Sequence, residues 1–357
     1  MHEHEDNWQA FRNSLTFQSE KRLGVIPVLG TGFNRHLLTD LVYPDGLVDW
    51  RELLRGVARG AGVGLPDMAP DGQALISAWE SMVLQYRSIL AAERKTTVQA
   101  SDAEAALQRE VCAWIRVQTN RLRIDVQEPA ASFLGRFQDV LNLNFDDLLL
   151  PQADAAVGGT GWSPMCRVGG SRVWHPHGTV LRPASLKLGV RRYGMGIHRL
   201  ELARGRFKKE ERKRRPAARN DCEANAHRAA DLTCPDWLAA AINAPLLLFG
   251  VGLGPDEWLM WWFLHNRARN HAGLKLDRVP PVFRLTCDAD SQSAGARAWR
   301  SHSAVRFIDL HGGKDWTAAW DKLSGMLDTA TTLPAHAQPI GSALDAAKVT
   351  EVRHAVS

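Results

Sequence analysis

The sequence predicts an α/β protein built on a mostly parallel sheet, for two reasons. Six short apolar segments are bounded by turn residues, and most are continuous rather than alternating, as in strands covered on both faces. Helical stretches with apolar residues at three-and-four spacing lie between these segments. Strands that alternate with helices favour a Rossmann-like, doubly wound parallel sheet of about six strands. The expected strands are residues 23–29, 139–144, 172–177, 245–249, 281–286 and 304–310.

The spacing of these elements divides the chain. Residues 73–92 and 101–123 carry apolar side chains at helical spacing, and the stretch between the first two strands is too long for a simple crossover. A helix is also expected over 256–270, where two carboxylates stand in the first turn. We therefore expect an N-terminal helical extension (1–20), an α/β domain (21–328) with an inserted helical layer (about 50–138) and a basic insertion (about 187–240), and a C-terminal tail (329–357).

Composition excludes several classes of protein. Of the 357 residues, 45% are hydrophobic and 23% are charged, which is typical of a globular chain and not of a disordered or fibrous one. No apolar run approaches the ~20 residues of a membrane span, and the first residues lack a basic-then-apolar signal, so we expect a cytoplasmic protein without membrane contact. The five cysteines form no CxxC pair, so neither a disulfide framework nor a cysteine zinc site is predicted.

The net charge of +5 is a local property of the chain. Residues 204–219 hold nine Lys or Arg and two Glu, which leaves the rest of the chain with a net charge of −2. A solvated loop is the interpretation that this charge density favours, ahead of a surface for an acidic partner. Contact with a nucleic-acid backbone comes last, because Phe207 is the only aromatic residue among these charges.

A glycine-containing turn follows the first expected strand. Gly30 and Gly32 at this place allow a tight turn and a close backbone approach to a pyrophosphate. Arg35 stands where the GxGxxG fingerprint has its third glycine, so a plain strand-to-helix turn explains this motif alone equally well. The candidate residues are Gly30, Thr31, Gly32, Phe33 and Asn34.

A second glycine turn follows the fourth expected strand. Gly250, Gly252 and Leu253 lead to Asp256 and a predicted helix, which repeats the design of the first turn. A flexible connector is the alternative, but the apolar strand immediately before the turn favours a fixed position. Two such turns at two strand ends could close on one dinucleotide from both sides.

Amide and imidazole side chains stand at the ends of the second and third strands. In open α/β sheets the carboxyl ends of the strands border the ligand crevice. Asn144 could position a water molecule or a ribose hydroxyl there, and Asn142, which shares its face, stays an alternative. Of His175 and His177, one is suited to be a general base near neutral pH and the other to pack. Asp146 could cap the next helix.

The order of these four segments resembles that of the SIR2-like (sirtuin-fold) family, and in particular its divergent, zinc-less bacterial branch. The glycine turn Gly30–Asn34, the segment Leu143–Asp146, the pair His177-Gly178 and the segment Gly250–Asp256 stand in family order and at plausible spacings. The resemblance spans about residues 21–311.

The resemblance implies a site that binds NAD as a substrate and holds no metal. Asn144 would be the catalytic asparagine and His177 the catalytic histidine. The first glycine turn would line the phosphate and the ribose, and the second would hold the adenosine side. The NAD-binding residues so implied are Gly30, Thr31, Gly32, Phe33, Asn34, Asp146, Gly250, Gly252, Leu253 and Asp256.

Departures from the family pattern narrow the implied function. The protein-deacylase members carry a four-cysteine zinc module after the H-G segment, and the cysteine spacings here cannot build it. Asn34 replaces the usual serine, and Leu143 replaces the usual threonine. The resemblance implies an NAD+ glycohydrolase that yields nicotinamide and ADP-ribose, acting as an effector of bacterial anti-phage defence. The alternatives are an NAD-dependent protein deacylase and a non-catalytic subunit that senses NAD or another nucleotide.

An NADase that was always active would harm its own cell, so we expect control by assembly or by a partner. A homo-oligomer is one such form of control. The resemblance adds a ring-shaped, HerA-like ATPase as a partner protein. We expect no nucleic-acid contact through this chain alone.

Overall fold

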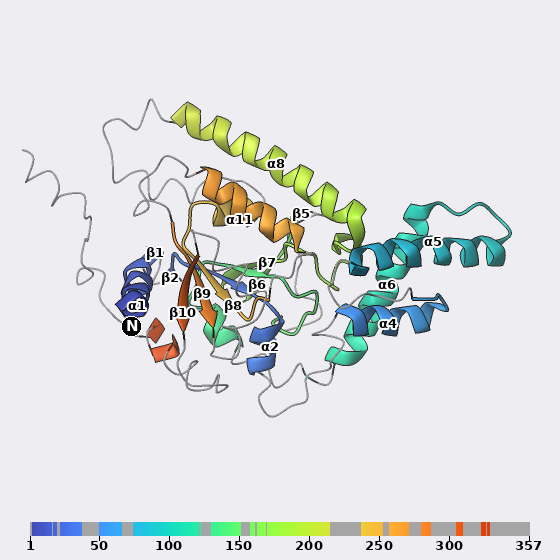
Figure 1. The fold of residues 1–357 in the computed structure, drawn as a ribbon, viewed down its shortest axis with the longest axis horizontal. Coiled ribbons are helices and arrows are strands. Elements are labelled where there is room, and N and C mark those ends of the chain that lie inside the picture. The colour runs from blue at the N-terminus through green and yellow to red at the C-terminus, as the bar shows by residue number, and fades with distance from the viewer. Residues whose placement is uncertain are drawn as a thin grey trace, which may run out of the picture.

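A computed structural model gives the fold shown in Figure 1, in which helices flank a mostly parallel sheet. The predicted α/β class is therefore confirmed. The expected C-terminal tail, Leu253 and Asp256 lie outside the described residues. The structure describes residues 2–15, 17–19, 22–37, 50–65, 74–120, 122, 130–150, 158–160, 163–168, 170–214, 237–252, 257–270, 280–286, 305–309, 323–325 and 327–328.

The main sheet has eight strands in the order β10-β9-β8-β3-β4-β7-β6-β5. All six apolar segments of the sequence form strands that pair in parallel. The sequence did not predict the antiparallel strands β5 (Gly158–Thr160) and β6 (Ser163–Val168) at one end of the sheet, nor the separate pair of β1 (Phe17–Ser19) and β2 (Arg22–Leu23). The six parallel strands are β3 (Ile26–Leu29), β4 (Asp139–Asn142), β7 (Ser171–Trp174), β8 (Leu246–Phe249), β9 (Val282–Thr286) and β10 (Val305–Asp309).

The strand order reverses at β3. The next parallel strand along the chain, β4, pairs with one edge of β3, whereas β8, the fourth in chain order, pairs with the other. Doubly wound sheets of this order bind ligands outside the carboxyl ends of the strands at the reversal. Both glycine turns of the sequence lie at this point, one after β3 and one after β8.

Apolar side chains cover both faces of the sheet. Leu247 and Phe249 of β8 belong to a core that includes Phe11 of α1 (His2–Ser14). Leu246 and Leu248 of the same strand belong to a second core, built with α8 (Gly189–Arg214), α10 (Trp237–Ala241) and α11 (Trp258–Asn270). Alternate residues of one strand thus bury into opposite layers, which explains why the strand segments read as continuous apolar runs.

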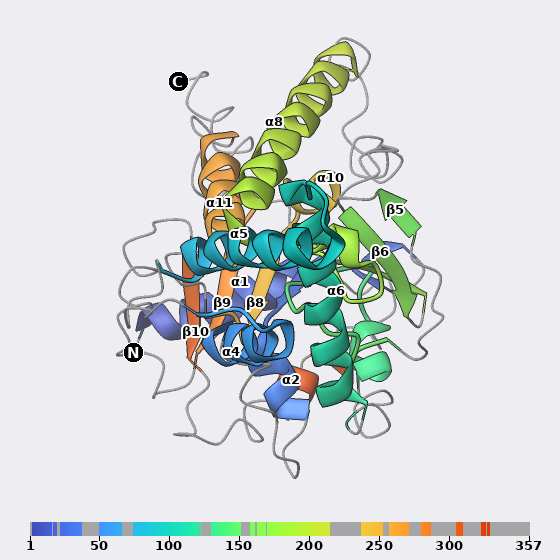
Figure 2. The ribbon, with the colours of Figure 1, turned by 90° about the vertical axis from the view of Figure 1, so that its right-hand side faces the viewer.

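Three helices between β3 and β4 pack around a third core. They lie together to the right of the sheet in Figure 1 and face the viewer in Figure 2. Phe145, Val180 and Leu186, from the segments that follow β4 and β7, complete this core. The helices are α4 (Trp50–Ala61), α5 (Ala74–Arg94) and α6 (Ala100–Thr119), and they follow the short α2 (Thr31–Leu37).

The long helix α8 corrects one prediction. A loop was expected over 204–219, but residues 204–214 continue α8, whose end projects beyond the other described elements in Figure 2. Lys, Arg and Glu are good helix formers, so a high charge density does not by itself prevent a helix. Residues 215–219 lie outside the described part of the chain. Among the described helices, none is long and apolar enough to cross a membrane.

Candidate functional site at the carboxyl ends of the strands

The two glycine turns touch each other directly. Gly30 N donates to Phe249 O (3.0 Å) and Gly32 N donates to Gly250 O (3.1 Å). A Cβ on Gly30 would stand 2.3 Å from Gly250 O, and a Cβ on Gly250, whose φ is +62°, would stand 2.2 Å from Phe33 N. Only glycine fits such a contact. The two turns are therefore in direct backbone contact, and their binding of one dinucleotide stays a prediction.

The remaining residues of the turns differ in their surroundings. Phe33 is fully buried, and its ring lies 5.2 Å from that of Phe133 and 5.1 Å from that of Phe249. Its side chain is therefore a core element, and only its backbone belongs to the turn. Thr31 is half-buried, whereas Gly252 is exposed, with open space where a Cβ would stand.

Asn34 and Asp146 join the turn after β3 to the turn after β4. The Asn34 amide Nδ2 donates to both carboxylate oxygens of Asp146, at 3.2 and 3.0 Å, and both side chains are buried. Asp146 Oδ1 also accepts the N–H of Leu148 (3.2 Å), two residues along the chain. This Asx-type bond fixes the loop, and the described residues 147–150 that follow Asp146 form no helix.

The geometry distinguishes Asn142 from Asn144. Asn142 ends β4, and its side-chain Oδ1 accepts the backbone N–H of Asn144 (3.1 Å). Asn142 therefore helps to fix the turn in which Asn144 stands. The Nδ2 atoms of both asparagines are buried and have no hydrogen-bond partner among the described residues, so the two side chains differ in the bond made by Asn142 Oδ1.

His177 lies against the same turn as Asn144. Its Nδ1 is 3.2 Å from the carbonyl oxygen of Leu143, and its ring centroid is 6.2 Å from that of Phe145. His177 thus contacts both sequence neighbours of Asn144. On its other side the ring centroid of Tyr193 in α8 is 6.1 Å away. The structure therefore brings the ends of β4 and β7, and the two residues predicted to be catalytic, to one place.

Burial keeps the His177 imidazole neutral. Desolvation, helped by the nearby Lys187 ammonium and opposed by the Leu143 carbonyl, lowers the pKa of His177 to about 3. Lys187 is itself buried, which lowers its pKa to about 7. Its backbone N–H donates to His177 O (2.8 Å) and its ammonium donates to Pro176 O. A neutral imidazole can accept a proton, but alone it would be a weak base at this pKa.

Glu257 is a site residue that sequence reasoning missed. Its Oε2 lies 3.1 Å from His177 Nε2, and burial raises its pKa to about 7, although the side chain keeps 21% of its exposure. The sequence places two carboxylates, Asp256 and Glu257, at the start of this helix, and the predicted site includes only Asp256. Nothing in the sequence pattern relates residue 257 to residue 177, so the contact depends on the fold.

Several buried polar atoms of this region make no well-directed hydrogen bond to any described residue. Such atoms are uncommon in folded proteins, and where they gather they indicate a ligand site. His175, with a pKa lowered to about 4 by burial, contributes both of its ring nitrogens. The atoms are Asn142 Nδ2, Asn144 Nδ2 and His175 Nδ1 and Nε2, whereas His177 Nε2 and Glu257 Oε2 face each other at 3.1 Å.

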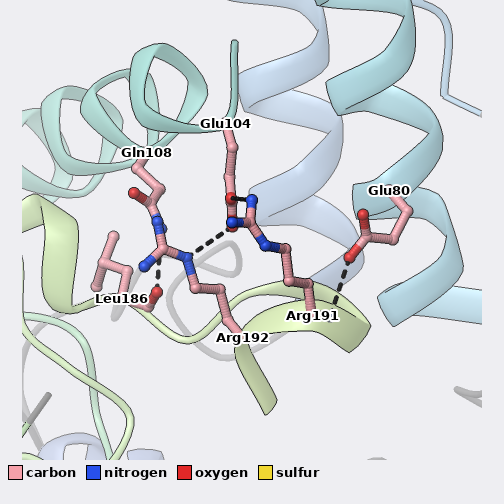
Figure 3. A network of polar contacts seen from close by, with 6 residues as sticks. All are labelled: Glu80, Glu104, Gln108, Leu186, Arg191 and Arg192. Carbon is pink, nitrogen blue, oxygen red and sulfur yellow. Dashed lines mark hydrogen bonds and ion pairs between the residues drawn. The ribbon is translucent and has the colours of Figure 1, made fainter. Parts of the chain in front are cut away.

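Helices α5 and α6 hold the segment that follows His177. Gln108 Nε2 donates to Leu186 O (3.0 Å), and Glu104 accepts from Arg191 (3.4 Å) and Arg192 (2.8 Å). Figure 3 shows this network, which Glu80 extends by accepting the backbone N–H of Arg191. The position of His177 therefore depends on helices α5 and α6, whose residues Glu80, Glu104 and Gln108 precede it by 97, 73 and 69 residues in the chain.

Comparison with protein-family models gave no match to this chain, and comparison with curated proteins gave no significant match. The functional argument therefore rests on the residues and their geometry.

Proposed function

We propose that the protein is an NAD+ glycohydrolase, which cleaves the nicotinamide–ribose bond to give nicotinamide and ADP-ribose. The observation that carries the proposal is that His177 lies against both neighbours of Asn144 at the carboxyl ends of β4 and β7, two parallel strands next to the reversal at β3. Buried polar atoms without directed partners gather at the same place. This agrees with the motif order that resembles the SIR2-like family.

The reaction requires a positioned nucleophile and a group that accepts the proton of that nucleophile. Loss of nicotinamide leaves an oxocarbenium-like ribose, which water or a hydroxyl attacks at C1′. In this proposal the Asn144 carboxamide orients the nucleophile, and His177 accepts its proton directly or through a ribose hydroxyl. General base assistance contributes typically about 10²–10⁴-fold, and fixed orientation of the reactants supplies much of the rest.

The proposal also assigns a role to the helices between β3 and β4. We infer that α4, α5 and α6 form an inserted helical layer on a Rossmann-like sheet and hold the His177 segment in place. Gln108 and Arg116 of α6 support this role, because they donate to the carbonyl oxygens of Leu186 (3.0 Å) and Val180 (3.1 Å).

The experiment that tests the proposal is nicotinamide release from NAD by the purified protein, followed by chromatography. We expect Asn144→Ala and His177→Ala to lose the activity. The matched controls are Asn243→Ala and His198→Ala, because these residues are exposed. Variants of Asn144 and His177 that cleave NAD at the wild-type rate would contradict the assignment of both residues.

The proposed biological role is depletion of NAD as part of bacterial anti-phage defence, controlled by assembly into an oligomer or by a partner such as a HerA-like ATPase. Cellular NAD measured after phage infection, in cells that express wild-type protein or His177→Ala, tests this role. Release of deacylated peptide in step with nicotinamide would instead identify a deacylase. Tight NAD binding without cleavage, alone and with partners, would identify a sensing subunit.

A further inference from the structure

The contact between His177 and Glu257 adds a third residue to the proposed site, which otherwise consists of Asn144 and His177. The Nε2 and Oε2 atoms, 3.1 Å apart, are both buried. Glu257 immediately precedes α11, and its carbonyl oxygen accepts the N–H of Trp261 (3.0 Å), which fixes its backbone to the first turn of that helix. The carboxyl is therefore held over the imidazole from a different element of the fold.

The tautomer of His177 follows from its other contact. A carbonyl oxygen can only accept, so the Nδ1 that lies 3.2 Å from Leu143 O carries the hydrogen. In the neutral ring, Nε2 then presents its lone pair to Glu257. Two lone pairs cannot attract each other, so the contact is favourable only when one proton lies between Nε2 and Oε2.

We propose that Glu257 is the positioning residue of His177 and that the two side chains together take up the single proton released in the reaction. This inference rests on the proposed NAD+ glycohydrolase function. His177 aligns the proton through Nε2, and Glu257 supplies the negative charge that makes its uptake favourable.

The proton balance of the step is simple. The bond from C1′ to the nicotinamide nitrogen breaks, and both electrons leave with nicotinamide. The oxygen of water forms a bond to C1′ and its proton passes to the pair, which changes from a net charge of −1 to neutral. The negative charge at the start also stabilises the positive charge of the oxocarbenium-like centre.

Other titratable groups lie near the pair, and their effects on the pH profile must be distinguished from the effect of the pair itself. Lys187 and His175 lie in the segment around His177, and Tyr193 faces the imidazole from α8. Burial gives Lys187 and Glu257 pKa values that are both about 7. A pH profile therefore has to be compared between variants of Lys187 and variants of Glu257.

The test combines kinetics with a measurement that does not need NAD cleavage. We expect the wild-type rate to rise through about pH 7. We expect Glu257→Gln to remove that rise and to lower kcat on the order of 10²-fold with little change in KM. Lys187→Met keeps that rise. Glu110→Gln, which changes an exposed carboxyl of α6, keeps both the rate and the profile.

Nitrogen NMR of histidine-labelled protein follows the pair itself. The His177 signals are identified by their loss in His177→Gln. In the wild type we expect a hydrogen on Nδ1 and an Nε2 shift that titrates near pH 7, and in Glu257→Gln we expect that titration to be absent. If the wild type releases no nicotinamide, the proposed function fails, and this spectrum alone decides whether the pair shares a proton.

Two results would overturn the inference. One is a wild-type rate and pH profile in Glu257→Gln together with an unchanged His177 titration. The other is a rate of NAD cleavage in Glu257→Ala that exceeds the wild-type rate. That result would mean that Glu257 blocks access of the substrate to His177 Nε2.

Discussion

The side chains of Asn34 and Asp146, 112 residues apart in the sequence, are joined by hydrogen bonds of 3.2 and 3.0 Å from one amide nitrogen to the two oxygens of one carboxylate. Both residues are buried, Asn34 in α2 and Asp146 just beyond β4. The amide replaces hydrogen bonds to water that the buried carboxylate has lost. The same contact joins the segment after the first parallel strand to the turn that carries Asn144.

Asn34→Ala is expected to lower the free energy of unfolding by about 1.5–3 kcal/mol, because it removes donors to a buried carboxylate. Asn243→Ala, at an exposed asparagine, is expected to change it by less than about 0.5 kcal/mol. Urea unfolding followed by circular dichroism measures both variants. Equal stability of Asn34→Ala and Asn243→Ala would show that the contact contributes nothing.

Gly250→Ala is expected to lower stability by more than about 2 kcal/mol, because a side chain at φ +62° is strained and its Cβ would meet Phe33 N at 2.2 Å. Gly60→Ala provides the opposite case. Gly60 lies in α4 with nothing within 4 Å of its Cβ position, so alanine should raise stability by about 0.5–1 kcal/mol. Thermal unfolding of both variants checks the two predictions. If the unfolding temperatures of Gly250→Ala and Gly60→Ala shift in the same direction from that of the wild type, the prediction is contradicted.

The sequence contained strong signals for the parallel strands and weak ones for the rest of the fold. Leu246–Phe249 is apolar throughout because its two faces pack into different cores, which gives an unambiguous pattern. Strand β6 (Ser163–Val168) contains a proline and an arginine and pairs antiparallel with both neighbours, so its pattern resembles a loop. The charged part of α8 lacks apolar periodicity, so its pattern predicts a loop, although Lys, Arg and Glu have high helix propensities.

The candidate site was predictable only where a motif stands at a strand end. Asn144 and His177 follow β4 and β7 directly, and parallel strands bring their carboxyl ends to one edge. The contact of Glu257 with His177 joins segments 80 residues apart, and the contact of Gln108 with Leu186 joins segments 78 apart. Such pairs depend on how helices pack, which residue types and local spacing do not encode.

Gln108→Ala is expected to disturb the site from a distance. The change leaves the buried carbonyl of Leu186 without the 3.0 Å bond from Nε2, which should cost about 1–3 kcal/mol of stability. It also frees the segment that begins at His177, so NAD cleavage should fall by up to about 10²-fold. Gln99→Ala is the control, since Gln99 is exposed and makes no side-chain cap bond. Nicotinamide release and urea unfolding are measured together, and a fall in stability alone would restrict Gln108 to a structural role.

Lys187→Met is expected to change how stability depends on pH. Burial lowers the pKa of Lys187 from 10.5 to about 7 in the folded protein, so between these values the unfolded chain binds more protons at this residue. The contribution of Lys187 therefore makes the free energy of unfolding rise with pH over that range, by at most about 1.4 kcal/mol per pH unit. Urea unfolding at pH 7, 8 and 9 should show this component in the wild type and in Lys95→Met, whose lysine is exposed, but not in Lys187→Met. Equal slopes in all three proteins would mean that Lys187 keeps its charge in the folded state.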